Sequence, residues 1–215
     1  LKNYEIGLKA DLMDRMVSID IAAFYMDWQD IQLAVNFPGG TSGYGNGGSA
    51  RSRGIEASIG WQPIDGLTLG ANGAYTDAVL TADSPAGASG RDGDRLPRIP
   101  KWSGSLTADY RLAVASNAEM RIGGGLRHTG RRVSDVTSNI PSLYPVFADA
   151  YTALDLNAAI TIDQRWTLRA YARNVTDSEG AISRSLSADA IGRPNFISVT
   201  PVQPRTVGLA VEASF

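Results

Sequence analysis

The chain ends with the ten residues Thr206-Val207-Gly208-Leu209-Ala210-Val211-Glu212-Ala213-Ser214-Phe215. Apolar side chains occupy every second position, and small or polar side chains lie between them. Because successive side chains of a strand point to opposite faces, this period of two predicts a β-strand with one apolar face. The same alternation is clear around residues 4–12, 54–61, 102–112 and 154–162, and weaker near 17–36, 67–79, 119–131 and 166–176. We therefore predict nine strands and no amphipathic helix. Apolar residues on both faces of 24–28 predict a β-bulge or a protein-covered patch there.

The composition excludes several classes of protein. The 215 residues hold 20 Lys+Arg against 22 Asp+Glu, a net charge of -2, so no basic excess indicates nucleic-acid binding. The absence of Cys excludes disulfide scaffolds and thiolate chemistry, and the single histidine, His128, excludes a His-rich zinc site. The longest apolar run, 21–26, is far shorter than the roughly 20 residues of a membrane-spanning helix.

The connections between the predicted strands alternate strictly in length. Tight connections fall at 13–16, 63–66, 113–118 and 163–165, and long ones rich in Gly, Ser, Pro and Asp fall at 37–49, 80–99, 132–149 and 177–203. A soluble sandwich has no reason to place every long loop at one end. An outer-membrane barrel does, because its periplasmic turns are short and its extracellular loops are long.

The strand lengths and the aromatic residues agree with a barrel. Each predicted strand is about 11 to 15 residues long, whereas a tilted strand needs about 9–11 residues to span a bilayer. Aromatic residues fall near strand ends, where interfacial girdles lie: Trp61, Trp102, Tyr110, Trp166 and Phe215. An open edge in hydrocarbon would leave backbone groups unpaired, so the sheet must close. We predict an all-β fold, an antiparallel transmembrane β-barrel.

The number of strands predicts that this chain is a fragment. With Phe215 in the periplasm and nine strands counted backwards, the first strand begins on the extracellular side. Bacterial single-chain barrels have an even number of strands and begin in the periplasm. We therefore expect further strands before Leu1.

A series of short motifs resembles one family of barrels. They are, in order, Asn3-Tyr4-Glu5-Ile6-Gly7-Leu8-Lys9, Ala23-Phe24-Tyr25 with Asp30-Ile31-Gln32, Ala50-Arg51-Ser52-Arg53-Gly54-Ile55-Glu56, Leu69-Gly70-Ala71-Asn72-Gly73-Ala74-Tyr75-Thr76-Asp77-Ala78, Leu96-Pro97-Arg98-Ile99-Pro100-Lys101-Trp102, Tyr151-Thr152-Ala153-Leu154-Asp155-Leu156, Asn174-Val175-Thr176-Asp177 and Pro204-Arg205-Thr206-Val207-Gly208-Leu209. In this order, over nearly the whole chain, the sequence resembles the barrel of TonB-dependent outer-membrane receptors of the siderophore-receptor type.

The resemblance implies that residues 1–215 are the C-terminal portion of such a barrel, about nine strands of 22, without the N-terminal plug domain. It implies a receptor in the outer membrane of a Gram-negative bacterium that captures a scarce nutrient, a ferric siderophore above all, with its extracellular loops. Release of the ligand inward would be driven through the plug by the TonB complex. No cofactor is implied, and the expected partners are membrane lipid, lipopolysaccharide, TonB and the barrel-assembly machinery.

The terminal strand is expected to carry the signal for that assembly machinery, on Val207, Leu209, Val211 and Phe215; the same alternation would also serve simply as a lipid-facing strand. Candidate ligand contacts lie among small residues of the long loops: Arg91, Arg95, Arg131, Arg132, Arg184, Arg193, Tyr44 and Tyr144, with Arg98, Phe147 and Phe196 as further members. Guanidinium groups attract anionic chelates. The alternative for these arginines is loop solubility or contact with lipopolysaccharide phosphates.

The remaining motifs favour structural roles. Glu56 is expected to face the lumen, and Asn174-Val175-Thr176-Asp177 to end a strand in a turn. The run 123–125 of three glycines lacks the Gly-Lys-Ser/Thr of a phosphate loop, and His128 has no neighbouring Cys or His. No nucleophile elbow or triad is present, so we predict no enzyme.

Two other functions remain open from sequence. One is a passive porin or structural barrel, which a plug domain encoded upstream would exclude. The other is a soluble all-β carbohydrate-binding module, which would partition into buffer without detergent.

Overall fold

The computed structural model describes residues 1–36, 42–86, 88–134, 146–188 and 194–214. Within these residues every regular element is a strand, as the alternation predicts. None of the described residues belongs to a helix that is long and apolar enough to cross a membrane.

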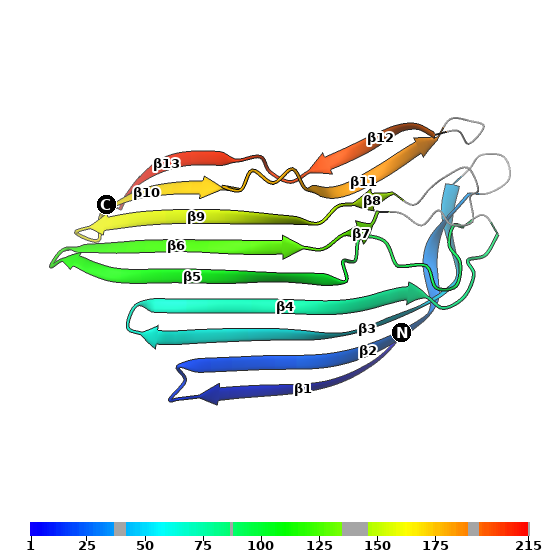
Figure 1. Ribbon diagram of the computed structural model, residues 1–215, viewed down its shortest axis with the longest axis horizontal. Coiled ribbons are helices and arrows are strands. Elements are labelled where there is room, and N and C mark those ends of the chain that lie inside the picture. The colour runs from blue at the N-terminus through cyan, green and yellow to red at the C-terminus, as the bar shows by residue number, and fades with distance from the viewer. Residues whose placement is uncertain (37–41, 87, 135–145, 189–193, 215) are drawn as a thin grey trace.

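Nine strands form a single antiparallel sheet, which confirms the predicted number (Figure 1). They are β1 (Lys2–Leu12), β2 (Val17–Asn36), β3 (Ser42–Ile64), β4 (Leu67–Leu80), β5 (Trp102–Ala115), β6 (Ala118–Thr129), β9 (Tyr151–Ile162), β10 (Trp166–Arg173) and β13 (Thr206–Ala213). The order β1-β2-β3-β4-β5-β6-β9-β10-β13 is a simple meander, in which each strand pairs with the next.

The short connections all lie at one end of this sheet and the long ones at the other, as predicted (Figure 1). We call these the short-turn end and the long-connection end. The β9–β10 turn places Asp163 and Gln164 at φ 54°, and the β3–β4 turn places Gly66 at φ 79°. The β9–β10 turn therefore has positive φ at both central residues, which is typical of a type I′ turn, whose twist matches that of the flanking strands. The N-terminus lies toward the long-connection end and the C-terminus at the short-turn end.

Three of the predicted long loops contain strands that the sequence did not indicate. Residues 42–49 belong to β3 and pair with β2, so the predicted loop 37–49 is wrong for this part. The loop 132–149 contains β7 (Arg132–Val133) paired with β8 (Phe147–Ala148), and 177–203 contains the hairpin of β11 (Ala181–Ala188) and β12 (Pro194–Pro201). Residues 42–49 are rich in Gly and Ser, and β7 and β8 are only two residues long, so apolar alternation does not reveal these strands and only their pairing partners define them.

The bulge expected at 24–28 lies a few residues further on. Pairing with β3 is unbroken from Val17 to Gln29, and the register shifts between Gln29 and Gln32, where Asp30 has φ 55°. A short polar side chain such as Asp tolerates this left-handed conformation better than most. Phe24, apolar on the otherwise polar face, instead lies over Gly54, where an added Cβ would approach its ring to 2.8 Å.

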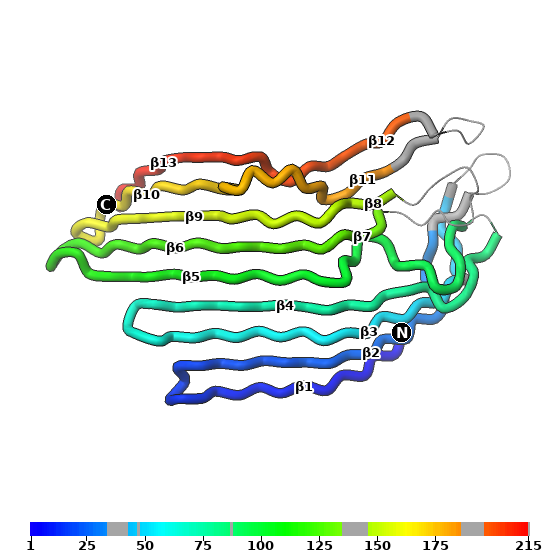
Figure 2. Tube along the Cα trace, in the orientation of Figure 1, coloured from blue at the N-terminus to red at the C-terminus, as the bar shows by residue number. Residues whose placement is uncertain are grey.

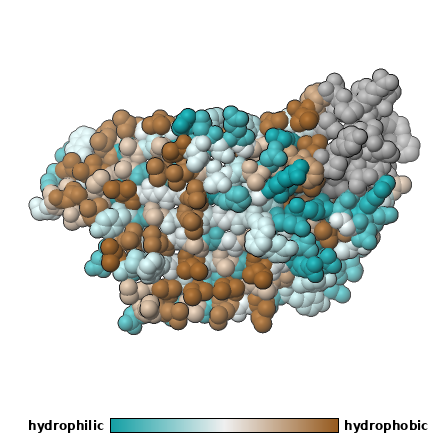
Figure 3. Space-filling view, viewed as in Figure 1, coloured by the Kyte–Doolittle hydropathy of each residue, from teal (hydrophilic) through white to brown (hydrophobic). Residues whose placement is uncertain are grey.

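The middle of the sheet is a wall with one apolar and one polar face. Register rows such as Leu69–Ala108–Gly124–Leu156 run across β4, β5, β6 and β9 on the apolar face. Large apolar side chains of this face are exposed, Leu106 on β5 to 56% and Ile122 on β6 to 46%. Figure 3 shows hydrophobic residues over the strands and hydrophilic residues gathered toward the long-connection end. A soluble sandwich would bury such a face, so its exposure favours contact with lipid.

A small hydrophobic core lies at the long-connection end. Ile31, Ala50 and Leu80 are buried there, and Leu33 and Leu96 pack against them. Figure 2 shows the ends of β2 and β3 bending away from the other strands toward the connection after β4. That connection folds back on β4, with the Leu96 N–H donating to the Ala78 carbonyl at 3.0 Å. The described part of the connection after β4 therefore packs against the ends of β2, β3 and β4.

Candidate functional site: the long-connection end of the sheet

Aromatic residues border the apolar face at both ends. Trp61, Tyr110 and Trp166 lie at the short-turn end, and Tyr75 and Trp102 lie at the long-connection end with ring centroids 4.7 Å apart. Tyr75 lies eight residues along β4 from Leu67, the register partner of Tyr110, which corresponds to about 27 Å of strand. With a strand tilt of about 35–45°, this length corresponds to about 19–22 Å along the barrel axis, slightly less than the apolar band of about 25 Å. The predicted girdle residues therefore lie where expected, except Phe215, which is outside the described residues.

The opposite face is polar and carries ion pairs between neighbouring strands. They are Lys9–Asp20 at 3.0 Å, Arg111–Glu119 at 3.3 Å and Arg169–Glu212 at 3.0 Å. Glu56 is on the same face, since it pairs in register with Ala22 and Ala74 and lines the same hollow as Lys9 and Asp20. Glu56 therefore lies on the polar face, which is the face that would line the lumen of a closed barrel; that it faces a lumen stays a prediction.

Arg132 joins two distant connections at the end of this wall. Its side chain is 5% exposed, and Nη2 donates to the Ala181 carbonyl at 2.7 Å and to the Ile182 carbonyl at 2.6 Å. The guanidinium also lies 5.9 Å from the centroid of the Tyr151 ring. Its donors are thus directed to backbone carbonyls of β11, so Arg132 holds the β11–β12 hairpin to the sheet. Because Arg132 is buried and bonded to β11, it is not open to a ligand as the sequence predicted.

Arg131 and Arg184 converge on one carboxylate beside the Arg132 anchor. Arg184 Nη1 lies 3.2 Å from Asp149 Oδ2, and Arg131 Nε lies 3.9 Å from Asp149 Oδ1. The Arg131 guanidinium stacks 3.9 Å from the centroid of the Phe147 ring, and Arg184 Nη1 donates to the Phe147 carbonyl at 3.3 Å. The Arg184 N–H donates to Ser134 Oγ at 3.1 Å. We call Arg131, Phe147, Asp149 and Arg184 the arginine cluster; two guanidiniums share one carboxylate, so it carries a net positive charge.

The other predicted contact residues lie on different connections. Arg91 is exposed, while Arg95 donates from Nη2 to the Ile99 carbonyl at 3.1 Å, and both belong to the connection after β4. Arg98, on the same connection, is exposed with φ 65°. Tyr44 lies on the part of β3 that pairs only with β2 and is 82% exposed, and Phe196, on β12, is 58% exposed. Tyr144 and Arg193 lie outside the described residues.

Two features of this end were missed or underestimated from sequence. Asp149 is the carboxylate that gathers the arginine cluster, and nothing in the sequence around it indicated this. Asn174, with φ 48° and 4% exposed, donates from Nδ2 to the Gln203 carbonyl at 2.9 Å and accepts from the Ser178 N–H at 2.9 Å. Its own N–H donates to Asp155 Oδ1 at 2.7 Å. The predicted turn at 174–177 is therefore a junction between β9, β10 and the segment leading into β13.

The described residues contain no group of three or more His, Cys, Asp or Glu side chains placed to hold a metal ion. What this end offers is the arginine cluster, which places two guanidiniums, one carboxylate and an aromatic ring together. Such a surface suits an anionic ligand bound from outside the sheet.

Comparison with known proteins gives the family. Residues 1–175 match the family described as TonB dependent receptor-like, beta-barrel. The metal-pseudopaline receptor of Pseudomonas aeruginosa is 27% identical over 214 residues, which cover all of this chain and 27% of that protein. The ferrichrome outer membrane transporter/phage receptor of Escherichia coli is 26% identical over 155 residues, 72% of this chain and 20% of that protein.

Solved structures share the fold. The ferric yersiniabactin uptake receptor of Yersinia pestis aligns with a TM-score of 0.80 and 19% identity, over 99% of this chain and 29% of its own. The siderophore receptor PiuA of Acinetobacter baumannii aligns with a TM-score of 0.75 and 21% identity, over 98% and 28%. This chain thus spans little more than a quarter of the length of these proteins. Residues 1–215 belong to the TonB-dependent receptor family and form part of its outer-membrane β-barrel.

Proposed function

We propose that the intact receptor containing this chain takes up a ferric siderophore across the outer membrane. Relatives that match along the chain are named as receptors for a metal-pseudopaline complex or as a transporter of ferrichrome, and they support uptake of a metal chelate. The observation that carries the proposal here is the arginine cluster, a positively charged surface at the end of the sheet where extracellular loops lie. Family membership excludes the soluble carbohydrate-binding module.

The ligand contacts that we propose are members of the predicted set that are exposed or partly exposed. Arg131 and Arg184 supply guanidinium donors beside the Phe147 ring, and Asp149 holds both in place. Arg91, Arg95 and Tyr44 offer further contacts from neighbouring connections. A charge-assisted hydrogen bond from guanidinium to an anionic oxygen is roughly twice as strong as a neutral one, so an anionic chelate is favoured over neutral solutes.

The partners follow from the family and from the two faces of the sheet. Release of the ligand inward would be driven by the TonB complex, which would act on a plug domain outside residues 1–215. The apolar face would contact lipid, with lipopolysaccharide at the long-connection end. The exposed side chains of Val207, Leu209 and Val211 on β13 would be read by the barrel-assembly machinery.

Uptake can be tested in a Gram-negative strain that lacks its own siderophore receptors and expresses the intact receptor. Radioactive iron is supplied as ferripyoverdine or, as a chelate whose three hydroxamates leave the iron centre neutral, as ferrichrome, with and without a functional tonB gene. We expect TonB-dependent accumulation with one chelate, reduced at least tenfold by Arg131→Ala combined with Arg184→Ala. Lys101→Ala, an exposed cation outside the cluster, is the matched control. Accumulation that is equal without tonB would establish the passive porin instead.

A further inference from the structure

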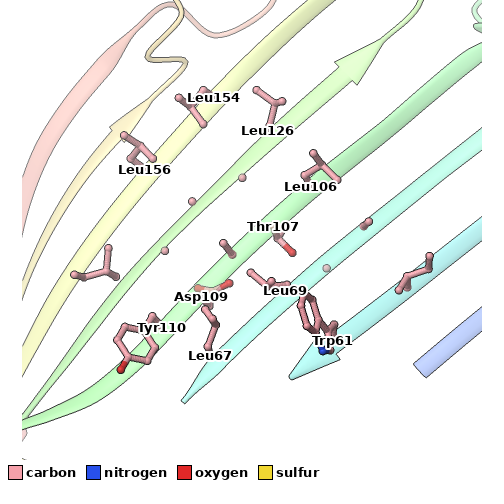
Figure 4. Close-up of a pocket in the computed structure, with 18 residues that line it drawn as sticks. Trp61, Leu67, Leu69, Leu106, Thr107, Asp109, Tyr110, Leu126, Leu154 and Leu156 are labelled. Carbon is pink, nitrogen blue, oxygen red and sulfur yellow. The ribbon is translucent and has the colours of Figure 1, made fainter. Parts of the chain in front are cut away.

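A concave pocket, which we call the basin, lies on the apolar face of the sheet (Figure 4). Its floor is Ala108 and Gly124, register partners on β5 and β6. Its volume is about 690 Å³. That lies within the roughly 300–1,000 Å³ of pockets that hold small molecules.

Bulky side chains enclose the floor on every side. Leu106, Leu126 and Leu154 form one register row toward the long-connection end, and Tyr110 with Ile122 forms the opposite row toward the short turns. Leu69 and Trp61 close the side of β3 and β4, and Leu156 closes the side of β9 (Figure 4). Rows four residues apart on β5 are separated by about 13 Å along the strand.

No charged side chain projects into the basin from the strands that form its floor. Asp109 follows Ala108 but points to the polar face, where its carboxylate and the Asn157 amide lie over Gly123. Thr107 likewise alternates to the polar face. A basin lined by hydrocarbon within the lipid-facing band selects an apolar occupant.

The position of the basin decides which leaflet supplies that occupant. Ala108 is two residues from Tyr110, about 7 Å along the strand, and six residues from Trp102, about 20 Å. The basin therefore lies on the half of the band beside the short turns, which face the periplasm. Phospholipid fills that leaflet, and Trp61 and Tyr110 place aromatic rings with polar tips at the level of its headgroups.

We propose that this basin holds one acyl chain of a periplasmic-leaflet phospholipid as a retained, specific lipid. The basin opens onto the apolar face of the sheet, so an acyl chain can enter it from the bilayer. The inference concerns lipid binding by the wall and does not depend on the transported ligand.

The test is to count lipids that remain on the intact receptor. The receptor is inserted in vesicles of phosphatidylethanolamine and phosphatidylglycerol, extracted in mild detergent, washed, and examined by native mass spectrometry. We expect about one more retained phospholipid on the wild type than on Ala108→Leu, whose larger side chain fills the floor. Ala170→Leu, an exposed alanine of the same face on β10 that does not line the basin, should retain the wild-type number.

Folding is verified for each variant by the gel shift that intact barrels show before boiling. Ala71→Leu, which fills the basin from β4, replaces Ala108→Leu where the latter fails to assemble. Equal retention by the wild type and the filled variant would overturn the proposal. So would retention of lipopolysaccharide instead of phospholipid from native membranes, or a dimer of the wild type that Ala108→Leu converts to a monomer.

Discussion

The two ends of the sheet are held in different ways. At the short-turn end, each hairpin closes its own turn, as from the Met16 N–H to the Met13 carbonyl at 3.0 Å, and further hydrogen bonds join only adjacent hairpins, as from the Arg111 N–H to the Gly66 carbonyl at 2.9 Å. At the long-connection end, Arg132 reaches carbonyls 49 and 50 residues away, and the Arg98 N–H donates to the Val133 carbonyl at 2.6 Å. The short-turn end therefore depends on hairpins and their immediate neighbours in the sheet, whereas the long-connection end also depends on contacts between connections that are not adjacent in the sheet.

This difference suits the roles that we propose for the two ends. Short turns need only reverse the chain, and local backbone conformation does that. A ligand-facing surface needs side chains from several connections in fixed positions, which requires anchors between them. Four predictions test the contrast, and they are ordered by expected effect.

Replacing Arg132 by Ala should have the largest effect, and it should be local. Each hydrogen bond from a charged group contributes about 1.5–3 kcal/mol, so loss of the two bonds to β11 should destabilise the hairpin by about 3 kcal/mol. Hydrogen exchange followed by mass spectrometry should show faster exchange across 181–201, with β9 and β10 unchanged. Arg131→Ala, whose side chain is largely exposed, is the control. Faster exchange throughout the sheet would contradict a local anchor.

Replacing Asn174 by Ala should destabilise the junction by about 2 kcal/mol. The variant loses the side-chain hydrogen bonds to Ser178 and Gln203 and leaves an L-residue with a β-carbon at φ 48°. The free energy of unfolding of the intact receptor in detergent micelles measures the change. Asn174→Gly permits the same φ and removes the same hydrogen bonds, so it should recover part of the loss. A glycine variant less stable than the alanine variant would show that backbone strain plays no part.

At the short-turn end a substitution should stabilise the protein. Asp163→Asn with Gln164→Gly gives the β9–β10 turn the residues that type I′ turns prefer. Since both positions already have φ 54°, the gain should be about 1 kcal/mol, measured by the same unfolding experiment. Gln164→Ala keeps the unfavourable β-carbon and should give no gain. A loss of stability in the Asn-Gly variant would argue that this end depends on tertiary contacts.

The smallest effect is expected at a contact between two neighbouring turns. Asn117 Nδ2 donates to Asp163 Oδ1 at 2.8 Å, an exposed bond between the β5–β6 and β9–β10 turns. Asn117→Ala should cost about 0.5 kcal/mol, because exposed hydrogen bonds exchange with water. Asn117→Asp keeps the size of the side chain but opposes Asp163, so it should cost more in low salt than in high salt. Salt-independent stability of that variant would count against a direct contact.

Much of the wall could be predicted from residues alone. Alternation over Val207–Val211 and its counterparts gave the strands, their faces and the band between aromatic girdles, because side-chain period and bilayer thickness are both fixed. The bulge at Asp30 and the extension of β3 through 42–49 could not be predicted, since Gly-rich segments pair wherever a neighbouring strand offers hydrogen bonds.

The sequence predicted the candidate ligand contacts by residue type, and the structure shows which of them are buried and which lie together. Arg131, Arg132 and Arg184 were one set of loop arginines in the sequence. Folding buried Arg132 against two carbonyls and placed Arg131 and Arg184 around Asp149. The acceptors of Arg132 lie 49 and 50 residues away, and Asp149 lies 18 residues from Arg131 and 35 from Arg184, so no local pattern encodes which arginine finds which acceptor.

The sequence by itself determined an antiparallel sheet with a lipid-facing side, short turns at one end and long connections at the other, because each of these follows from local period and spacing. Only the tertiary structure decided the packing of those connections, the arginine that anchors them and the basin floored by Ala108 and Gly124. These arise where side chains from separate strands and loops meet, and their geometry is a property of the register and of long-range hydrogen bonds.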